Sequence, residues 1–194
     1  DEIFDPALSR LKAAGLLPDE IGWHPERITS DIDAIILGMH AREDNPELVR
    51  ARELGLKIYS FPEYLYEQTQ DKIRIVVGGS HGKTTVTALI THLLSYSKRK
   101  ISAFVGGIAR NIDSNVIIGD ENDEFVVMEA DEFDRSFLRL NPYVSVVTSI
   151  DADHLDIYGD TAHLEEAFNQ FVAKTSSDGV VVYNAALPIK TACK

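Results

Sequence analysis

The sequence predicts an α/β protein built on a parallel, doubly wound sheet. Short apolar runs, typical of strands buried on both faces, alternate along the chain with segments whose apolar residues recur at helical spacing. Parallel strands are joined by crossover connections that are usually helices, so this alternation favours a parallel sheet. The chain shows no internal repeat and no low-complexity segment.

The first 70 residues hold the weaker part of this pattern. Asp5-Pro6 is an N-cap followed by a first-turn proline and Gly15 suits the residue after a helix end, which together predict a helix over 6–14. Asn45-Pro46 opens a second helix that ends near Gly55. We also expect strands over 32–37 and 56–60, a helix over 62–69 and a polar domain boundary at 70–72.

The remainder of the chain has a stronger pattern. A buried strand over 73–77 leads through a glycine-rich turn at 78–83 into a helix over 84–95. In that helix the apolar residues at helical spacing are Val86, Leu89, Ile90, Leu93 and Leu94. Further strands are expected over 101–105, 125–128, 143–148 and 180–183, with an amphipathic helix over 161–174.

The composition excludes several classes of function. No stretch approaches the roughly 18 uninterrupted apolar residues of a membrane span, and because the first residues are acidic we expect no signal peptide. The formal net charge of −12 argues against a nucleic-acid or membrane-surface binder, although a local positive site for a small anion is allowed. The one cysteine, Cys193, cannot form an internal disulfide, so we expect a cytoplasmic protein.

The most informative stretch is 73–85, where strand, glycine-rich turn and helix start follow one another. The glycines let the backbone aim its N–H groups at an anion, and the helix adds its positive end. Lys83 would bridge the outer phosphates of a nucleotide, and the Thr84 hydroxyl would bind Mg²⁺. Val77 stands where a phosphate loop usually has its first glycine, so this loop is one residue shorter. The expected phosphate-binding residues are Gly79, Ser80, His81, Gly82, Lys83, Thr84 and Thr85.

Two further candidates follow predicted strands. Glu129 comes after the strand over 125–128, and His154 lies just past the strand over 143–148. The carboxyl ends of parallel strands share one edge of a sheet, so both side chains should converge on the phosphate loop. A carboxylate there suits the Mg²⁺ of a nucleoside triphosphate, whereas imidazole is an unusual Mg²⁺ ligand, so His154 either binds metal or orients a phosphate or a water. Solvated loop positions are the alternative for both residues.

In order and spacing, residues 79–85, 129–132 and 153–156 resemble the Mur ligase family, the ATP-dependent amide-forming enzymes of peptidoglycan precursor synthesis. The resemblance implies that Lys83 holds ATP phosphates, that Thr84 and Glu129 bind one Mg²⁺, and that His154 binds a second. Catalysis would then depend on Lys83, Glu129 and His154. The resemblance also implies an incomplete Rossmann-like domain for a UDP sugar over 1–70 and an incomplete, phosphate-loop-containing central domain for ATP over 71–194.

Two branches of that family compete. Residues 129–138 are similar to ligases that join L-alanine to UDP-N-acetylmuramate, while residues 38–48 resemble murein peptide ligases. Because we weigh the catalytic segment more, we expect L-alanine to be joined to the muramate carboxylate through an acyl phosphate. The recycled L-Ala-γ-D-Glu-diaminopimelate tripeptide is the alternative acceptor. Asn169 stands where several Mur ligases have a carbamylated lysine, which agrees with both branches.

Functions of other classes stay open. A phosphate-loop kinase or nucleotide switch predicts a lid arginine or a switch threonine, and neither is evident. A nucleotide-binding module without activity is the non-enzymatic alternative. The resemblance implies that the chain is a fragment, so we expect the 194 residues alone to be inactive; the oligomeric state is left open.

Overall fold

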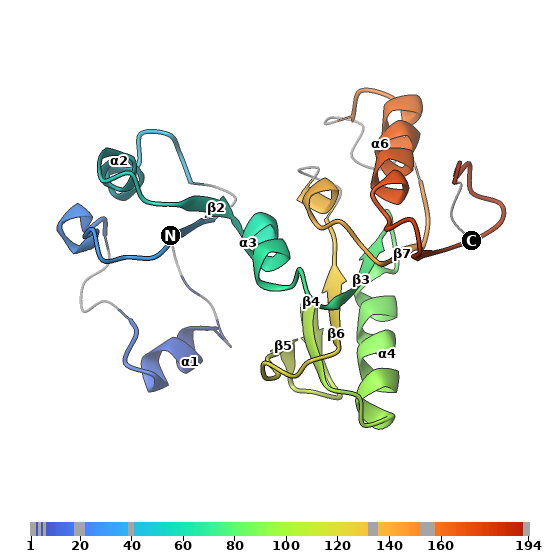
Figure 1. Cartoon of the computed structure of the whole chain (residues 1–194), viewed down its shortest axis with the longest axis horizontal. Helices are drawn as coiled ribbons and strands as arrows, with labels where there is room; N and C mark the ends of the chain where they lie inside the picture. Colours follow the sequence, from blue (N-terminus) through green and yellow to red (C-terminus); the bar gives the residue numbers. More distant parts are fainter. Residues whose placement is uncertain are drawn as a thin grey trace. The chain divides into compact units, whose positions relative to one another are not determined.

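The computed structural model describes residues 3, 5, 7–17, 22–38, 41–131, 136–151 and 158–191. The chain divides into two compact units, Asp1–Phe61 and Pro62–Lys194 (Figure 1). This division falls earlier in the chain than the polar residues at 70–72, because the helix over Phe61–Gln68 contributes Leu65 to the core of the second unit. Among the described residues, no helix is long and apolar enough to cross a membrane.

The first unit is a small α/β arrangement around two parallel strands. Strand β1 pairs with β2, with Ile35 opposite Ile58. The predicted cap of the following helix is confirmed, since the Asn45 side chain accepts hydrogen bonds from the Glu47 and Leu48 backbone N–H groups at 2.9 and 3.2 Å. The elements are α1 (Ala7–Ala13), η1 (Pro25–Arg27), β1 (Ile35–Leu37), α2 (Pro46–Glu53) and β2 (Ile58–Ser60).

The second unit is built on a six-stranded sheet in the order β5-β4-β6-β3-β7-β8. Every pairing is parallel except that of β4 with β5. The α/β class and the mostly parallel sheet are therefore confirmed. The elements are α3 (Phe61–Gln68), β3 (Ile73–Gly78), α4 (Lys83–Tyr96), β4 (Ile101–Ala109), β5 (Ser114–Ile117), β6 (Phe125–Glu129), η2 (Ser136–Arg139), β7 (Val144–Val147), α6 (Thr161–Ala173) and β8 (Val180–Tyr183).

The antiparallel edge strand β5 is not predicted by the sequence pattern. Strand β4 continues to Ala109, beyond its expected end, and the chain then turns back so that Ala109 lies opposite Ser114. A single antiparallel edge strand on an otherwise parallel sheet is a common arrangement. The pattern misses β5 because its four residues, Ser-Asn-Val-Ile, are too few and too polar to stand out as a buried strand.

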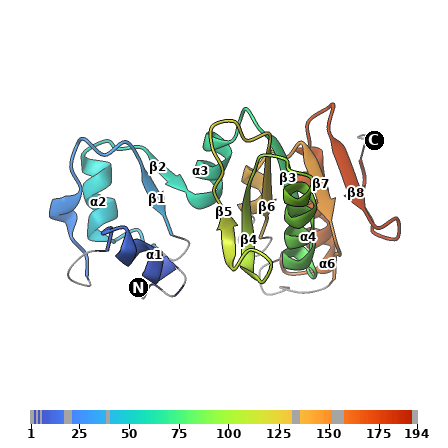
Figure 2. The same ribbon diagram turned by 90° about the horizontal axis from the view of Figure 1, so that it is seen from below.

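Helices cover both faces of the sheet, α4 on one and α6 on the other (Figures 1 and 2). Alternate residues of β3 point to opposite faces, so Ile75 joins the α4 side and Val76 the α6 side. The α6 side holds the larger core. Its buried members from α6 are Leu164, Ala167, Phe168, Phe171 and Val172.

The buried face of α4 differs from the expected apolar stripe. Leu89 and Leu93 are each 55% exposed, whereas Thr87 and Thr91 are fully buried against the sheet. The two hydroxyl groups donate to the carbonyl oxygens of Lys83 and Thr87, four residues earlier, at 2.8 and 2.7 Å. Because the helix itself satisfies these hydroxyls, threonine is buried here without an unpaired polar group.

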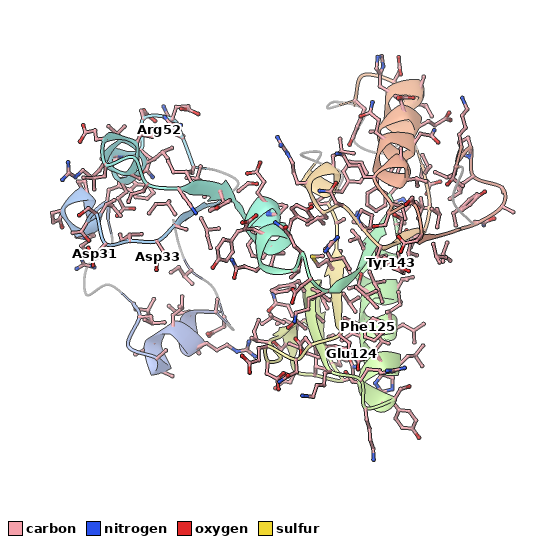
Figure 3. All side chains as sticks on the ribbon, in the orientation of Figure 1. Asp31, Asp33, Arg52, Glu124, Phe125 and Tyr143 are labelled. Atoms are coloured by element: carbon pink, nitrogen blue, oxygen red, sulfur yellow. The ribbon has the colours of Figure 1, made fainter. Side chains whose placement is uncertain are left out.

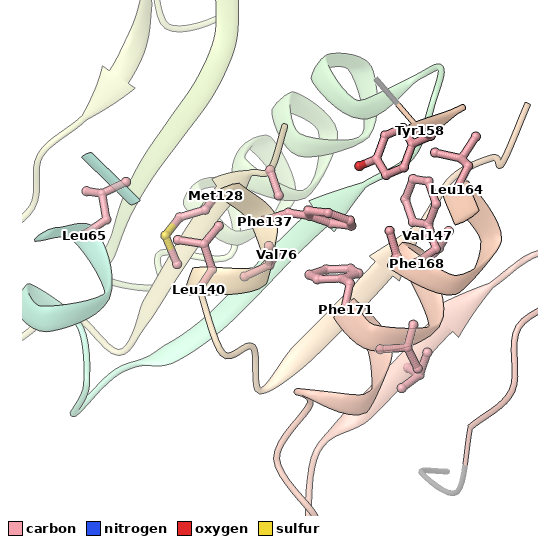
Figure 4. Packing of buried hydrophobic residues seen from close by; sticks show 14 of the residues in the cluster. Leu65, Val76, Met128, Phe137, Leu140, Val147, Tyr158, Leu164, Phe168 and Phe171 are labelled. Atoms are coloured by element: carbon pink, nitrogen blue, oxygen red, sulfur yellow. The ribbon is translucent and has the colours of Figure 1, made fainter. Parts of the chain in front are cut away.

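Three phenylalanines pack beneath the point where β3 ends. The ring of Phe137 lies 5.4 Å from that of Phe168 and 5.2 Å from that of Phe171, measured between centroids (Figure 4). The rings reach the backbone of β3: a side-chain carbon added at Gly78 would be in van der Waals contact with Phe171, at 3.5 Å. Residue 137 belongs to the segment that resembles the L-alanine ligases, so part of that segment supports the core below the phosphate loop.

A buried arginine ties α3 to the sheet. Arg74, in β3, is 9% exposed; its Nη1 donates to the carbonyl oxygens of Thr69 and Gln70 at 2.7 and 3.0 Å, and its Nε donates to that of Asn141 at 2.9 Å. The guanidinium also lies over the Tyr66 ring, 5.2 Å from its centroid. Burial lowers the pKa of Arg74 from its usual value, but an arginine stays charged, so these carbonyls solvate a buried cation.

We expect Arg74→Met to lower the free energy of unfolding by about 2–4 kcal/mol, because it leaves the buried Thr69 carbonyl and the partly buried hydrogen bonds to Gln70 and Asn141 without their donor. Arg99→Met is the matched control: Arg99 pairs with Glu124 at 2.9 Å and lies 5.8 Å from the Phe125 ring centroid, but it is exposed (Glu124 and Phe125 are labelled in Figure 3). An exposed pair of this kind contributes no more than about 1 kcal/mol. Urea unfolding followed by far-ultraviolet circular dichroism measures both, and equal losses would contradict the structural role of Arg74.

Candidate functional site

The glycine-rich turn connects the end of β3 to the start of α4. Gly79 and Gly82 have φ angles of +138° and +81°, in the region that side chains disfavour. Helix α4 begins at Lys83 with Gly82 as its N-cap, and no side chain caps it. The first amide N–H groups of an α-helix have no partner within the helix, so this end suits an anion.

The other part of the loop is attached to the end of β7. The backbone N–H groups of Ser80 and His81 donate to the carbonyl oxygen and the hydroxyl of Ser149, at 3.1 and 3.0 Å. The Ser80 hydroxyl also bonds with the backbone N–H and carbonyl of Asp151 at 3.0 and 3.1 Å. These two loop amides therefore hold the loop in place, and the start of α4 is the part suited to phosphate.

Thr148, just after β7, also bonds to the loop. Its hydroxyl donates to the carbonyl oxygens of His81 at 2.6 Å and Gly78 at 3.2 Å. A side-chain carbon at Gly79 would collide with this hydroxyl. The glycine is thus required by space as well as by its backbone angle.

Lys83 is the first residue of α4, and its ammonium group donates to the carbonyl oxygen of Gly79 at 2.8 Å. The side chain therefore lies back along the loop, beside the helix start. This is the position from which a phosphate-loop lysine reaches the outer phosphates of a nucleotide.

Glu129 is placed beside this helix by strand register. It ends β6, directly opposite Val77 of β3. One carboxylate oxygen, Oε1, accepts a hydrogen bond from the Thr84 hydroxyl at 2.8 Å, and the other, Oε2, accepts one from the Gly106 backbone N–H at 2.6 Å. The structure thus brings together Lys83, Thr84 and Glu129 at one edge of the sheet.

The pair of oxygens from Thr84 and Glu129 fits the requirements of Mg²⁺. Adjacent ligands of an octahedral ion bound at about 2.1 Å lie about 3 Å apart, close to the 2.8 Å observed here. Within the described residues, no three histidine, cysteine or acidic side chains gather as a metal site. Mg²⁺ usually keeps several waters and binds one or two protein groups together with substrate phosphates.

The other predicted site residues have different positions. Thr85 is exposed on the first turn of α4. His81 is also exposed, and its Nε2 lies 3.9 Å from a carboxylate oxygen of Asp151. His154 lies outside the described residues. Asn169 bonds to the backbone of 188–190: its side-chain oxygen accepts from the Lys190 N–H at 2.7 Å.

Sequence reasoning missed the residues that hold the site together. Thr148 ends the run that predicts β7 and Ser149 follows it, so the rule that placed His154 at this edge could have identified them. Gly106 gives a weaker signal, a Gly-Gly pair near the end of an apolar strand. Glycine in a strand often marks a close approach of another group, and here that group is Glu129.

The first unit contains its own cavity, with a volume of about 420 Å³. It lies at the carboxyl end of β1 and the start of α2. Polar groups enter it only from a few positions, while most of the lining is apolar. Lining residues include Trp23, Ile28, Leu37, Gly38, Asn45 and Leu48.

A mostly parallel sheet with a glycine-rich turn entering a helix defines the class of α/β proteins with a phosphate loop. Comparison with protein families gives the finer assignment: residues 77–194 match the Mur ligase middle domain. The chain belongs to the Mur ligase family, whose members are ATP-dependent ligases that form amide bonds.

Individual relatives agree with this assignment. The UDP-N-acetylmuramate–L-alanine ligase of Christiangramia forsetii is 40% identical over 173 residues, 88% of this chain and 38% of that protein. A crystallised UDP-N-acetylmuramate–alanine ligase from Thermotoga maritima is 29% identical with a TM-score of 0.74, covering 92% of this chain and 40% of that one.

A murein peptide ligase from Neisseria meningitides shares the fold, with a TM-score of 0.82 at 24% identity, covering 96% of this chain and 62% of that one. The matched part of the chain spans 38% of the length of the relative from Christiangramia forsetii, well under half.

We expect Thr148→Val to weaken nucleotide affinity by about fivefold in the full-length protein. The substitution keeps the shape of the side chain but removes the hydroxyl that holds the loop, and one such hydrogen bond is worth about 1 kcal/mol. Thr148→Ser, which keeps the hydroxyl, is expected to bind ADP like the wild type. Isothermal titration calorimetry with ADP and Mg²⁺ measures both, and equal affinities for the two variants would show that the hydroxyl does not hold the loop.

Proposed function

We propose that the full-length protein is an ATP-dependent ligase that joins L-alanine to the carboxylate of UDP-N-acetylmuramate. The observation that carries this proposal is the placement of Thr84 and Glu129, 2.8 Å apart, at the start of the helix that follows the phosphate loop. The substrates are proposed from the relatives, which are named as L-alanine ligases at 36–40% identity. With ATP and a nucleotide sugar as substrates, we place the reaction in the cytoplasm, in peptidoglycan precursor synthesis.

The proposed reaction has two steps. First, an oxygen of the muramate carboxylate attacks the γ-phosphorus of ATP, the bond to the bridging oxygen breaks, and ADP leaves. Second, the amine of L-alanine attacks the carbonyl carbon of the resulting acyl phosphate. Inorganic phosphate then leaves, the amine loses a proton, and the amide bond is complete. No side chain of this chain forms a covalent bond in either step.

The protein contributes position and charge. The amide groups at the start of α4 and the Lys83 ammonium group would hold the ATP phosphates and stabilise the negative charge that spreads over the transferring phosphoryl group. Thr84 and Glu129 would hold one Mg²⁺, which supplies further positive charge at the phosphates. By resemblance to the family, we propose that His154 binds a second Mg²⁺.

The two units receive separate roles in this proposal. The second unit would bind ATP, and the first would bind the UDP sugar. The cavity at the carboxyl end of β1 supports the assignment of the UDP sugar to the first unit. Ligands of parallel α/β proteins bind at that edge of the sheet, and the cavity is mostly apolar with a few polar groups, as ligand sites commonly are.

The tripeptide is the weaker candidate acceptor. Residues 38–48 resemble the murein peptide ligases, and such a ligase shares the fold, but at 24% identity that likeness is to the fold alone. The relatives of higher identity are named for L-alanine. A phosphate-loop kinase finds no support among the relatives, whose family forms amide bonds.

The function is tested by incubating the full-length protein with ATP, Mg²⁺ and UDP-N-acetylmuramate, with L-alanine in one reaction and the tripeptide in another. In the L-alanine reaction we expect ADP, phosphate and the L-alanyl product to form in equal amounts, with the product identified by mass spectrometry. We expect this product to form faster than the tripeptide product forms in the other reaction. Preferred use of the tripeptide would assign the protein to the murein peptide ligases. ATP turnover without any amide product would contradict the proposal.

Lys83→Ala should remove most of this activity while leaving the fold intact, because the substitution removes a charge from the phosphates and Lys83 belongs to neither hydrophobic core cluster. We expect a loss of about 100-fold or more in kcat, typical of removing one group that stabilises transition-state charge. Lys174→Ala, at the exposed end of α6, is the control. Phosphate release measures the rates, and an unchanged rate for Lys83→Ala with an unchanged circular dichroism spectrum would refute the role of the lysine.

A further inference from the structure

We propose that Gly106 is a positioning residue for Glu129: its backbone N–H holds one carboxylate oxygen, and its lack of a side chain makes the space in which the carboxylate lies. This inference deepens the proposed function, since it rests on the metal-binding role proposed for Glu129. It assigns a part in the site to a residue of β4, a strand that contributes no other group to it.

The sheet brings the two residues together. Strands β4 and β6 are parallel neighbours, with Phe104 opposite Met128. Beyond that pair, β6 ends at Glu129 while β4 continues through Val105 and Gly106 to Ala109. The backbone of β4 therefore passes beside the Glu129 side chain, and the Gly106 N–H donates to Oε2 at 2.6 Å.

Any side chain at this position would compete with the Glu129 carboxylate for space. A side-chain carbon on residue 106 would lie 2.5–2.7 Å from all three atoms of the Glu129 carboxylate group. Such distances are well inside van der Waals contact, so any other residue must displace the carboxylate. The requirement is one of space, because it arises from the neighbouring side chain rather than from the backbone angle of the glycine.

The hydrogen bond gives the two oxygens of Glu129 different environments. Oε2 is held by the backbone of β4, while Oε1 lies against the Thr84 hydroxyl at the start of α4. A hydrogen bond from a backbone N–H to a carboxylate is charge-assisted and stronger than one between neutral groups. Gly106 thus fixes the orientation of the carboxylate. Oε1 then stays beside the Thr84 hydroxyl, at the start of α4. Groups that orient a metal ligand in this way commonly govern metal affinity.

The neighbouring glycine provides a matched control. A side-chain carbon on Gly107 would meet one described atom within 4 Å, the methyl carbon of Thr84, at an ordinary contact distance of 3.5 Å. Gly107→Ala therefore makes the same chemical change one residue along the same strand without touching Glu129.

The test measures Mn²⁺ binding to the full-length protein in the presence of ADP, from the electron paramagnetic resonance signal of free Mn²⁺. This readout needs no turnover. We expect Gly106→Ala to raise the dissociation constant for Mn²⁺ by about tenfold or more. Gly107→Ala is expected to bind Mn²⁺ like the wild type. Glu129→Ala should weaken binding at least as much as Gly106→Ala, and the double variant should be no weaker than Glu129→Ala alone, because Gly106 acts through the carboxylate.

Three results of the binding measurement would overturn the inference, and they are distinguishable. Wild-type binding by Gly106→Ala beside weakened binding by Glu129→Ala would show that Gly106 does not position the carboxylate. Additive losses in the double variant would show that Gly106 acts by another route. Wild-type binding by Glu129→Ala would remove the proposed metal role of Glu129 and the inference with it.

Thermal unfolding is measured for each variant. If Gly106→Ala alone does not fold, the double variant should fold, because the obstructing carboxylate is gone. Failure of both to fold would overturn the assignment of the clash to Glu129.

Discussion

The position of β3 between β6 and β7 is the constraint on which the site depends. Its pairing with β6 sets Glu129 opposite Val77, and its pairing with β7 sets Val147 opposite Gly78. The phosphate loop therefore begins between the carboxyl ends of β6 and β7, and side chains at these two ends can reach it. One of them supplies the carboxylate that meets Thr84, and the other supplies the hydroxyls that hold the loop. A slip of either pairing by one residue would turn these side chains to the other face of the sheet.

The two halves of the phosphate loop have different roles. Its first amides bond to Ser149, so their hydrogen bonds are satisfied by the protein. The uncapped start of α4 follows Gly82 and is the half suited to phosphate. An anion site works best when its donors are already in place before the ligand arrives, because little ordering is then required on binding. Bonds from β7 to the loop provide that order without using the donors at the helix start.

The sequence predicts well what depends on local pattern. The buried run of β3, the glycine turn and the helix after it are recognisable because each has a distinct composition, and Glu129 is found by the rule for parallel strand ends. Contacts between distant segments are harder. Thr87 and Thr91 are buried through hydrogen bonds that hydropathy does not register. Gly106 matters because of a carboxylate 23 residues away, and Thr148 because of a loop 67 residues away, so the local sequence around each does not show which group it contacts.

The central claim is that the Thr84 hydroxyl and the Glu129 carboxylate form one metal-binding site beside the phosphate loop. A crystal structure of the full-length protein grown with Mn²⁺ and a non-hydrolysable ATP analogue tests it most directly, through the anomalous scattering of the metal. The account predicts an anomalous peak within coordination distance of Thr84 Oγ1 and Glu129 Oε1, with Glu129 Oε2 still bonded to the Gly106 N–H and the analogue's phosphates at the start of α4. Phosphates bound at the loop with the metal held by other groups, and with Thr84 still donating to Glu129, would contradict it.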